Sequence, residues 1–162
     1  MTTKRRPGAA QARAAWEQLA ERKAIVTAAD LQARWGLTQQ RVQKLVAPTA
    51  GFAEPISGGY GAIWLAADVD EWTQANKTRP GKPGPRSAMP ELGVADADAD
   101  REAWQAIKRS GGLTTIAELA AEWGITERAA RNRTKRDGFP EPVTAGRWLN
   151  AEIQAAAALP ER

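Results

Sequence analysis

The chain carries the same sequence pattern twice, at an offset of 88 residues. Residues 29–38, Ala-Asp-Leu-Gln-Ala-Arg-Trp-Gly-Leu-Thr, recur as residues 117–126, Ala-Glu-Leu-Ala-Ala-Glu-Trp-Gly-Ile-Thr. The similarity then continues toward the end of each copy. Six of the seven tryptophans fall at paired positions: 16 and 104, 35 and 123, 64 and 148. Large apolar side chains at matched positions indicate that each copy has its own core.

The repeat therefore predicts two small domains of one architecture. We place copy one at residues 9–75 and copy two at residues 97–159, and we expect residues 1–8 to be disordered. Residues 76–96 are rich in Pro, Gly, Lys and Arg. This composition predicts an extended, mobile linker, because proline at such density blocks a helix. The basic linker is read as a tether, with a DNA-contacting arm as the alternative.

Composition excludes several classes of protein. The chain has no Cys and no His, so disulfides, Cys/His zinc sites and imidazole bases are absent. No nucleophile or phosphate-loop motif occurs. We therefore expect no enzyme, no catalytic residues, no metal and no cofactor. No apolar run reaches the roughly 20 residues that span a bilayer, and no signal peptide is indicated. The expected location is the cytoplasm.

Helix signals follow the same order in both copies. Each copy has a Thr-capped helix that ends at a Gly, followed after one apolar residue by a second Thr-capped helix. In copy one these residues are Thr27, Gly36 and Thr38; in copy two they are Thr115, Gly124 and Thr126. Gly-containing stretches over residues 51–65 and 142–149 predict small β-hairpins. The predicted helices include residues 9–22, 39–47, 68–74, 97–109, 116–123, 127–136 and 151–158.

Two helices joined by a three-residue turn through Gly have helix-turn-helix geometry. With the Gly-Ile-Thr turn, the stretch from Gly138 to Val143 and the pair Arg147-Trp148, the unit resembles the winged helix-turn-helix of the MerR/excisionase (AlpA-like) superfamily. The resemblance covers about residues 24–75 and 112–158. Copy one departs from the pattern at Ala53 and has a longer hairpin. The predicted fold class is mainly α with small β-hairpin wings, as two tandem winged helix-turn-helix domains.

Positive charge is concentrated rather than spread evenly. The net charge is +4, and residues 128–136 contain five Lys and Arg with no acidic residue. The linker is a second basic stretch. Such localised charge fits a nucleic-acid footprint, with an ordinary solvated surface as the alternative.

The resemblance implies that the second helix of each copy enters the major groove and that the hairpin contacts the backbone or the minor groove. The residues expected to face outward are Gln39, Gln40, Gln43 and Lys44 in copy one, and Arg128, Arg131, Asn132 and Lys135 in copy two. Gln and Asn suit adenine and Arg suits guanine, so the copies should read unlike half-sites.

Three further residues are candidates for contacts with the DNA backbone. Arg133 falls where copy one has the core residue Leu45, and we expect it to extend toward a phosphate. Tyr60 and Arg147 are expected near the hairpin tips, where they would contact sugar and phosphate. Packing under the hairpin is an equal alternative for Tyr60.

The leading hypothesis is a sequence-specific double-stranded DNA-binding protein that acts as a transcriptional regulator or excisionase-type factor. One alternative is the DNA-recognition subunit of a phage packaging machine, similar to a small terminase. Another is a protein-interaction module that has lost DNA binding. The expected partner is double-stranded DNA and no membrane, and the chain is either a monomer with two pseudo-repeated domains or a homodimer.

Overall fold

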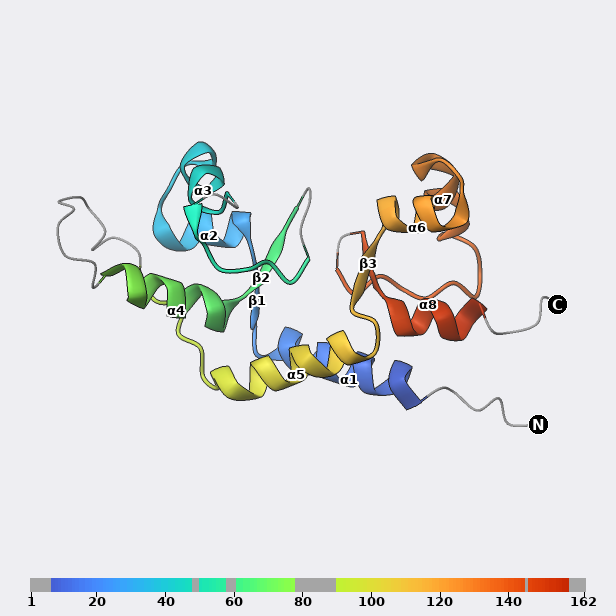
Figure 1. The fold of residues 1–162 in the computed structure, drawn as a ribbon, viewed down its shortest axis with the longest axis horizontal. Helices are drawn as coiled ribbons and strands as arrows, with labels where there is room; N and C mark the ends of the chain where they lie inside the picture. Colours follow the sequence, from blue (N-terminus) through green and yellow to red (C-terminus); the bar gives the residue numbers. More distant parts are fainter. Residues whose placement is uncertain (1–6, 48–49, 58–60, 78–89, 145, 158–162) are drawn as a thin grey trace. The chain divides into compact units, whose positions relative to one another are not determined.

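The computed structural model describes residues 7–47, 50–57, 61–77, 90–144 and 146–157. Within these residues the chain is mainly helical, with eight helices and two small antiparallel sheets of two strands each (Figure 1). No helix among these residues is long and apolar enough to cross a membrane. The coarse prediction of a mainly α fold with small β elements is confirmed.

The two copies have the same order of elements. Copy one contains β1 (Ile25–Thr27), α2 (Ala28–Trp35), α3 (Gln39–Leu45), β2 (Ile63–Leu65) and α4 (Ala66–Lys77). Copy two contains β3 (Leu113–Thr115), α6 (Ile116–Trp123), α7 (Glu127–Arg133), β4 (Arg147–Leu149) and α8 (Asn150–Ala157). The two longer helices are α1 (Pro7–Glu21) and α5 (Ala97–Arg109).

Several predicted helices are observed at or near the expected bounds. Helix α5 and helix α6 begin and end as predicted. Helix α1 begins at Pro7, so residues 7 and 8, which were expected to be disordered, belong to a helix. Residues 1–6 lie outside the described part of the chain. Helix α7 ends three residues before the predicted bound, because Thr134 is its C-cap.

The sheets differ from the predicted hairpins. Strand β2 pairs with β1, which precedes α2, in the register Ile25 to Leu65, and β4 pairs with β3 in the same way. Among the described residues, a hairpin partner is present only as a short extension of each sheet: Ile56 N–H donates to the carbonyl of Ile63 at 2.8 Å. The first strand of each sheet was not predicted, since three residues are too few to show an alternating pattern.

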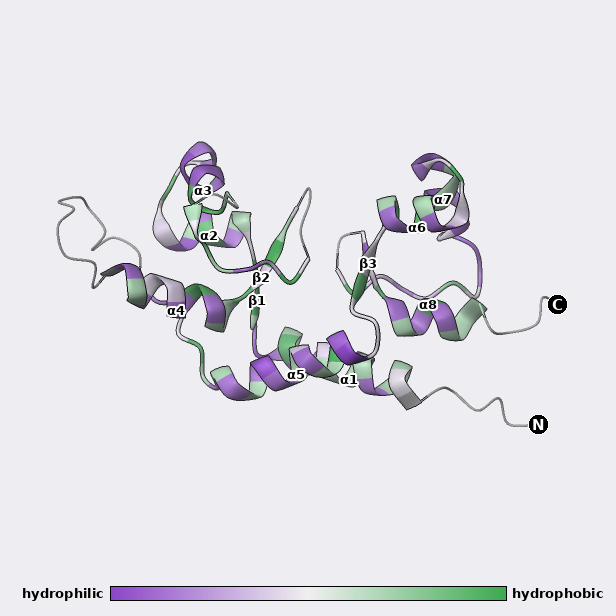
Figure 2. Cartoon of the chain, in the orientation of Figure 1, coloured by the Kyte–Doolittle hydropathy of each residue, from purple (hydrophilic) through white to green (hydrophobic). Residues whose placement is uncertain are grey.

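The copy-one core is an aromatic and aliphatic cluster, and Figure 2 shows β2 in the apolar colour. Its members include Leu31, Trp35, Val42, Trp64 and Val69, all 4% exposed or less. The Phe52 ring meets Trp35, Trp64 and Trp72 with ring centroids 4.7–6.3 Å apart. Trp35 and Trp64 of the repeat thus anchor this core, as predicted from their matched positions.

Residues 90–94, which we call the strap, pack on copy one. Leu92 is 8% exposed and joins the core cluster, and Trp35 Nε1 donates to the carbonyl of Pro90 at 3.3 Å. The Leu92 N–H donates to Asp70 Oδ1 at 2.6 Å, and Arg34 donates to the carbonyl of Leu92. The expectation of a mobile linker is therefore wrong for this part of residues 76–96. Residues 78–89 lie outside the described chain.

The chain divides into two compact units whose bounds differ from those of the repeat. The copy-one unit is residues 19–101, and the copy-two unit is residues 1–18 together with 102–162. Most of α1, the first helix of copy one in sequence, thus belongs to the copy-two unit. The first residues of α5, the first helix of copy two, belong to the copy-one unit.

Two matched arginines hold these helices in their units. In the copy-two unit, Arg13 Nε donates to Glu152 Oε1 at 2.7 Å. In the copy-one unit, Arg101 Nε donates to Asp68 Oδ1 at 3.1 Å. Arg13 and Arg101 are 88 residues apart, and Asp68 and Glu152 are matched positions on α4 and α8. The same ion pair therefore forms twice, each time between the first helix of one copy and the last helix of the other.

Candidate nucleic-acid interface

In each copy, a helix with capped ends is followed by a tight turn and a short second helix. Thr27 and Asp30 form a capping box at the start of α2, and Gly36 ends it with φ of 62°. Copy two has the same box at Thr115 and Glu118. A left-handed backbone conformation has a low energy only for glycine. Gly36 therefore allows the abrupt turn that sets the direction of α3. The predicted caps and turns are confirmed.

One residue on the inner side fixes each short helix to its unit. Val42 of α3 and Ala130 of α7 are both fully buried, at matched positions. The Thr38 and Thr126 side chains accept N–H groups in the first turn of α3 and α7. With one face buried and the start capped, most of the remaining side chains of both helices are exposed.

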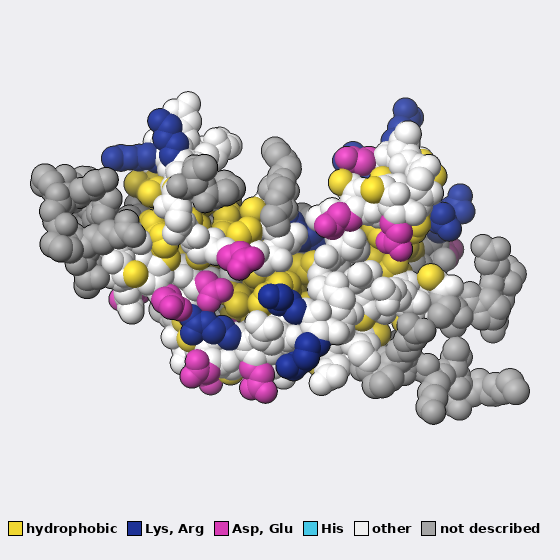
Figure 3. Space-filling model, in the orientation of Figure 1, with side chains coloured by type: hydrophobic (Ala, Val, Ile, Leu, Met, Phe, Trp, Pro, Cys, Tyr) yellow, Lys and Arg dark blue, Asp and Glu magenta, His cyan; other side chains and the backbone are white. Residues whose placement is uncertain are grey.

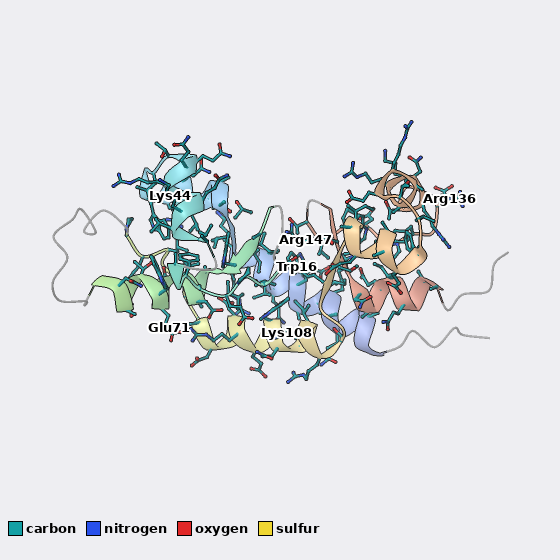
Figure 4. All side chains as sticks on the ribbon, turned by 45° about the horizontal axis from the view of Figure 1, so that its top comes forward. Trp16, Lys44, Glu71, Lys108, Arg136 and Arg147 are labelled. Atoms are coloured by element: carbon teal, nitrogen blue, oxygen red, sulfur yellow. The ribbon has the colours of Figure 1, made fainter. Side chains whose placement is uncertain are left out.

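The outward face of α3 is polar and weakly charged. All four predicted residues, Gln39, Gln40, Gln43 and Lys44, are exposed, as is Arg41. Figure 4 shows Lys44 on the outer side of this helix. Three adjacent amides present both donors and acceptors, which is the chemistry needed to hydrogen-bond base edges.

The outward face of α7 and the turn after it is strongly basic. Arg128, Arg131, Asn132 and Lys135 are all exposed, as predicted, and Arg136 extends the cluster. Figures 3 and 4 show Lys and Arg side chains over this helix, with Arg136 reaching outward. The cluster can neutralise phosphates or donate to guanine.

Glu127, at the first position of α7, was not among the predicted site residues. Its carboxylate accepts a hydrogen bond from Arg131 at 3.2 Å, four residues along the helix. The spacing of an acid and a base at i and i+4 was visible in the sequence and is the signal that could have found it.

Arg133 of α7 is exposed and also contacts an aromatic ring. Its guanidinium carbon lies 4.8 Å from the centroid of the Trp123 ring, in cation–π geometry. At the matched position of copy one, Leu45 packs on the core. The arginine thus covers Trp123 where copy one uses a leucine, and this contact competes with the predicted reach toward a phosphate.

Arg147 is not an exposed residue of the hairpin tip. It lies in β4, opposite Thr115, and only 5% of it is exposed. Burial lowers the pKa of its guanidinium from the usual value, while the nearby Glu118 carboxylate opposes that shift. A side chain this buried is poorly placed for a phosphate contact.

Tyr60 lies outside the described residues, as does most of the linker. Among the described residues, no group of three or more Asp and Glu side chains is arranged to hold a metal ion. Comparison with protein-family models, with curated proteins and with solved structures finds no significant match.

Proposed function

We propose that this chain binds double-stranded DNA in a sequence-specific manner through two tandem winged helix-turn-helix elements. In each, a capped helix precedes a turn and a second helix, and β2 or β4 follows. The second helices, α3 and α7, insert into the major groove, and the segments that extend β2 and β4 form the wings. The proposed role is that of a transcriptional regulator or an excisionase-type factor.

The observation that carries the proposal is the exposed row of Arg128, Arg131 and Asn132 on α7. A helix that buries only Ala130 and projects guanidinium and amide groups fits a groove lined with acceptors. The matched residues of α3 are Gln40, Gln43 and Lys44, which form a second polar surface of different base preference.

The test begins with selection of bound fragments from a genomic library by the purified chain at about 150 mM salt, where backbone attraction alone is weakened. We expect one or a few sites, each with two unlike half-sites. The genes beside the sites would then distinguish regulation from excision. Recovery of no enriched sequence would overturn the proposal.

Affinity for a selected site is then compared between two triple variants, one on each helix. Replacing Arg128, Arg131 and Asn132 by Ala should weaken binding about 100-fold or more, since each lost base contact has a cost of about 1–3 kcal/mol. Replacing Gln39, Gln40 and Gln43 by Ala should weaken binding less, because no charge is removed. Unchanged affinity in the first variant would exclude α7 from the interface.

A further inference from the structure

A carboxylate stands at the start of a helix that is otherwise cationic. Over residues 127–136, Glu127 is the single acid against five Lys and Arg residues. The side chains of Glu127 and Arg131 are 53% and 63% exposed, and their ion pair is 3.2 Å long. An exposed pair at this spacing adds little to the stability of a helix, and an acid in the first turn adds a small further amount through the helix dipole.

On a surface that approaches phosphates, the same carboxylate weakens general attraction to DNA. The matched position in copy one is Gln39, which carries no charge, and Gln43 stands where copy two has Arg131. The acid and its arginine partner therefore occur together in α7 and are absent together from α3. This joint difference suggests one function for the pair.

The chemistry of the pair matches a base step that contains one guanine and one cytosine. An arginine donates to N7 and O6 of guanine, and a glutamate accepts from the N4 amine of cytosine. In the major groove thymine presents the O4 acceptor at the equivalent place, which repels a carboxylate. The first residues of a groove-bound helix are those nearest the base edges. Glu127 and Arg131 lie on one face of α7, one turn apart.

Building on the proposed function, we infer that Glu127 is a specificity-determining residue. Arg131 donates to a guanine in the copy-two half-site, and Glu127 both orients that guanidinium and accepts from the N4 amine of a cytosine. Its charge also lowers affinity for DNA that lacks this step. Copy one, with amides at both positions, does not require such a step.

The experiment compares selection from a randomised DNA library by the wild type, Glu127→Gln and Gln39→Glu. Both positions are exposed at the start of matched helices, so both variants should fold, which circular dichroism verifies. For Glu127→Gln we expect the preference for cytosine over thymine at one position of the copy-two half-site to fall about tenfold. Affinity for random DNA should rise, because a negative charge is removed.

The control variant Gln39→Glu places a carboxylate on α3 without an arginine four residues on. It should lower affinity for all DNA and leave the copy-two half-site unchanged. A wild-type site with the cytosine preference kept in Glu127→Gln would overturn this inference and leave the proposed function standing. A wild type that selects no sequence would overturn both.

Discussion

Copy one and copy two share a sequence pattern but close their cores differently. In copy one Trp35 is 4% exposed, with the strap and the Trp72 ring beside it. In copy two the matched Trp123 is only partly buried, and Arg133 covers its ring. Copy two also has the buried Arg147 where copy one has Ile63. A repeat thus conserves the positions of core residues more closely than the means of covering them.

The largest expected effect comes from truncation of the two matched tryptophans, which tests whether the two cores differ in how they are covered. Trp35→Ala should destabilise the copy-one unit by about 4 kcal/mol, within the range for a buried aromatic residue. Trp123→Ala should destabilise the copy-two unit by about half as much, because its ring already contacts solvent. Urea unfolding, monitored by hydrogen exchange of the backbone amides in each of the two sheets, reports the stability of each unit separately. Equal losses would show that the strap adds nothing to burial of Trp35.

The strap itself is tested by Leu92→Ala. We expect a loss of about 2–3 kcal/mol in the copy-one unit, since a buried leucine leaves a cavity. The copy-two unit should be unaffected. The control is Glu91→Ala, an exposed neighbour whose replacement should change stability by less than about 0.5 kcal/mol. A loss equal to that of the control would contradict docking of the strap.

The substitution Arg147→Ile places in copy two the residue that copy one has at the matched position, Ile63. Because a buried charge is replaced by an apolar group, the copy-two unit should gain about 1 kcal/mol of stability. DNA affinity should not change, since Arg147 is buried. Arg131→Ala is the opposite control: stability should hold while affinity falls. Loss of affinity in Arg147→Ile would restore this residue to the interface.

The smallest expected effect concerns Asp100 of α5. Burial raises the pKa of its carboxyl, with Arg22, 3.1 Å away, opposing the shift. The folded copy-one unit therefore binds a proton more readily than the unfolded chain does. This contribution to stability is present at acidic pH and is lost as pH rises through the raised pKa.

Replacement of Asp100 by Asn should remove that pH dependence and shift stability by about 1 kcal/mol or less. The difference in unfolding free energy between wild type and variant, followed from pH 3 to 7, isolates this group from other carboxylates. A difference that stays constant across that range would contradict the raised pKa.

Local signals predicted most of the fold. The Thr caps and the Gly turns depend only on neighbours in sequence, and these elements are observed. The helix over residues 97–109 was predicted from the repeat and is also observed. The outward residues predicted for α3 and α7 are exposed. The strap was missed because Leu92 and Val94 are too few apolar residues to form a pattern within a proline-rich stretch.

What sequence could not supply was the choice of packing partners. The positions of Arg133 and Arg147 in the repeat were known, but not that one contacts Trp123 and the other is buried. Likewise, the repeat shows that the first helix of copy one resembles the first helix of copy two. It does not show which copy each helix packs against, because that depends on contacts distant in sequence.

The placement of most of α1 in the copy-two unit has a practical consequence for dividing this chain into fragments. A fragment that starts at residue 97 retains the whole of copy two as the repeat defines it, yet lacks the part of α1 that belongs to the copy-two unit. Arg13, the partner of Glu152, is lost with it. A cut in the linker would therefore yield two pieces that each need the other, and restored folding on mixing them would be the signature of that dependence.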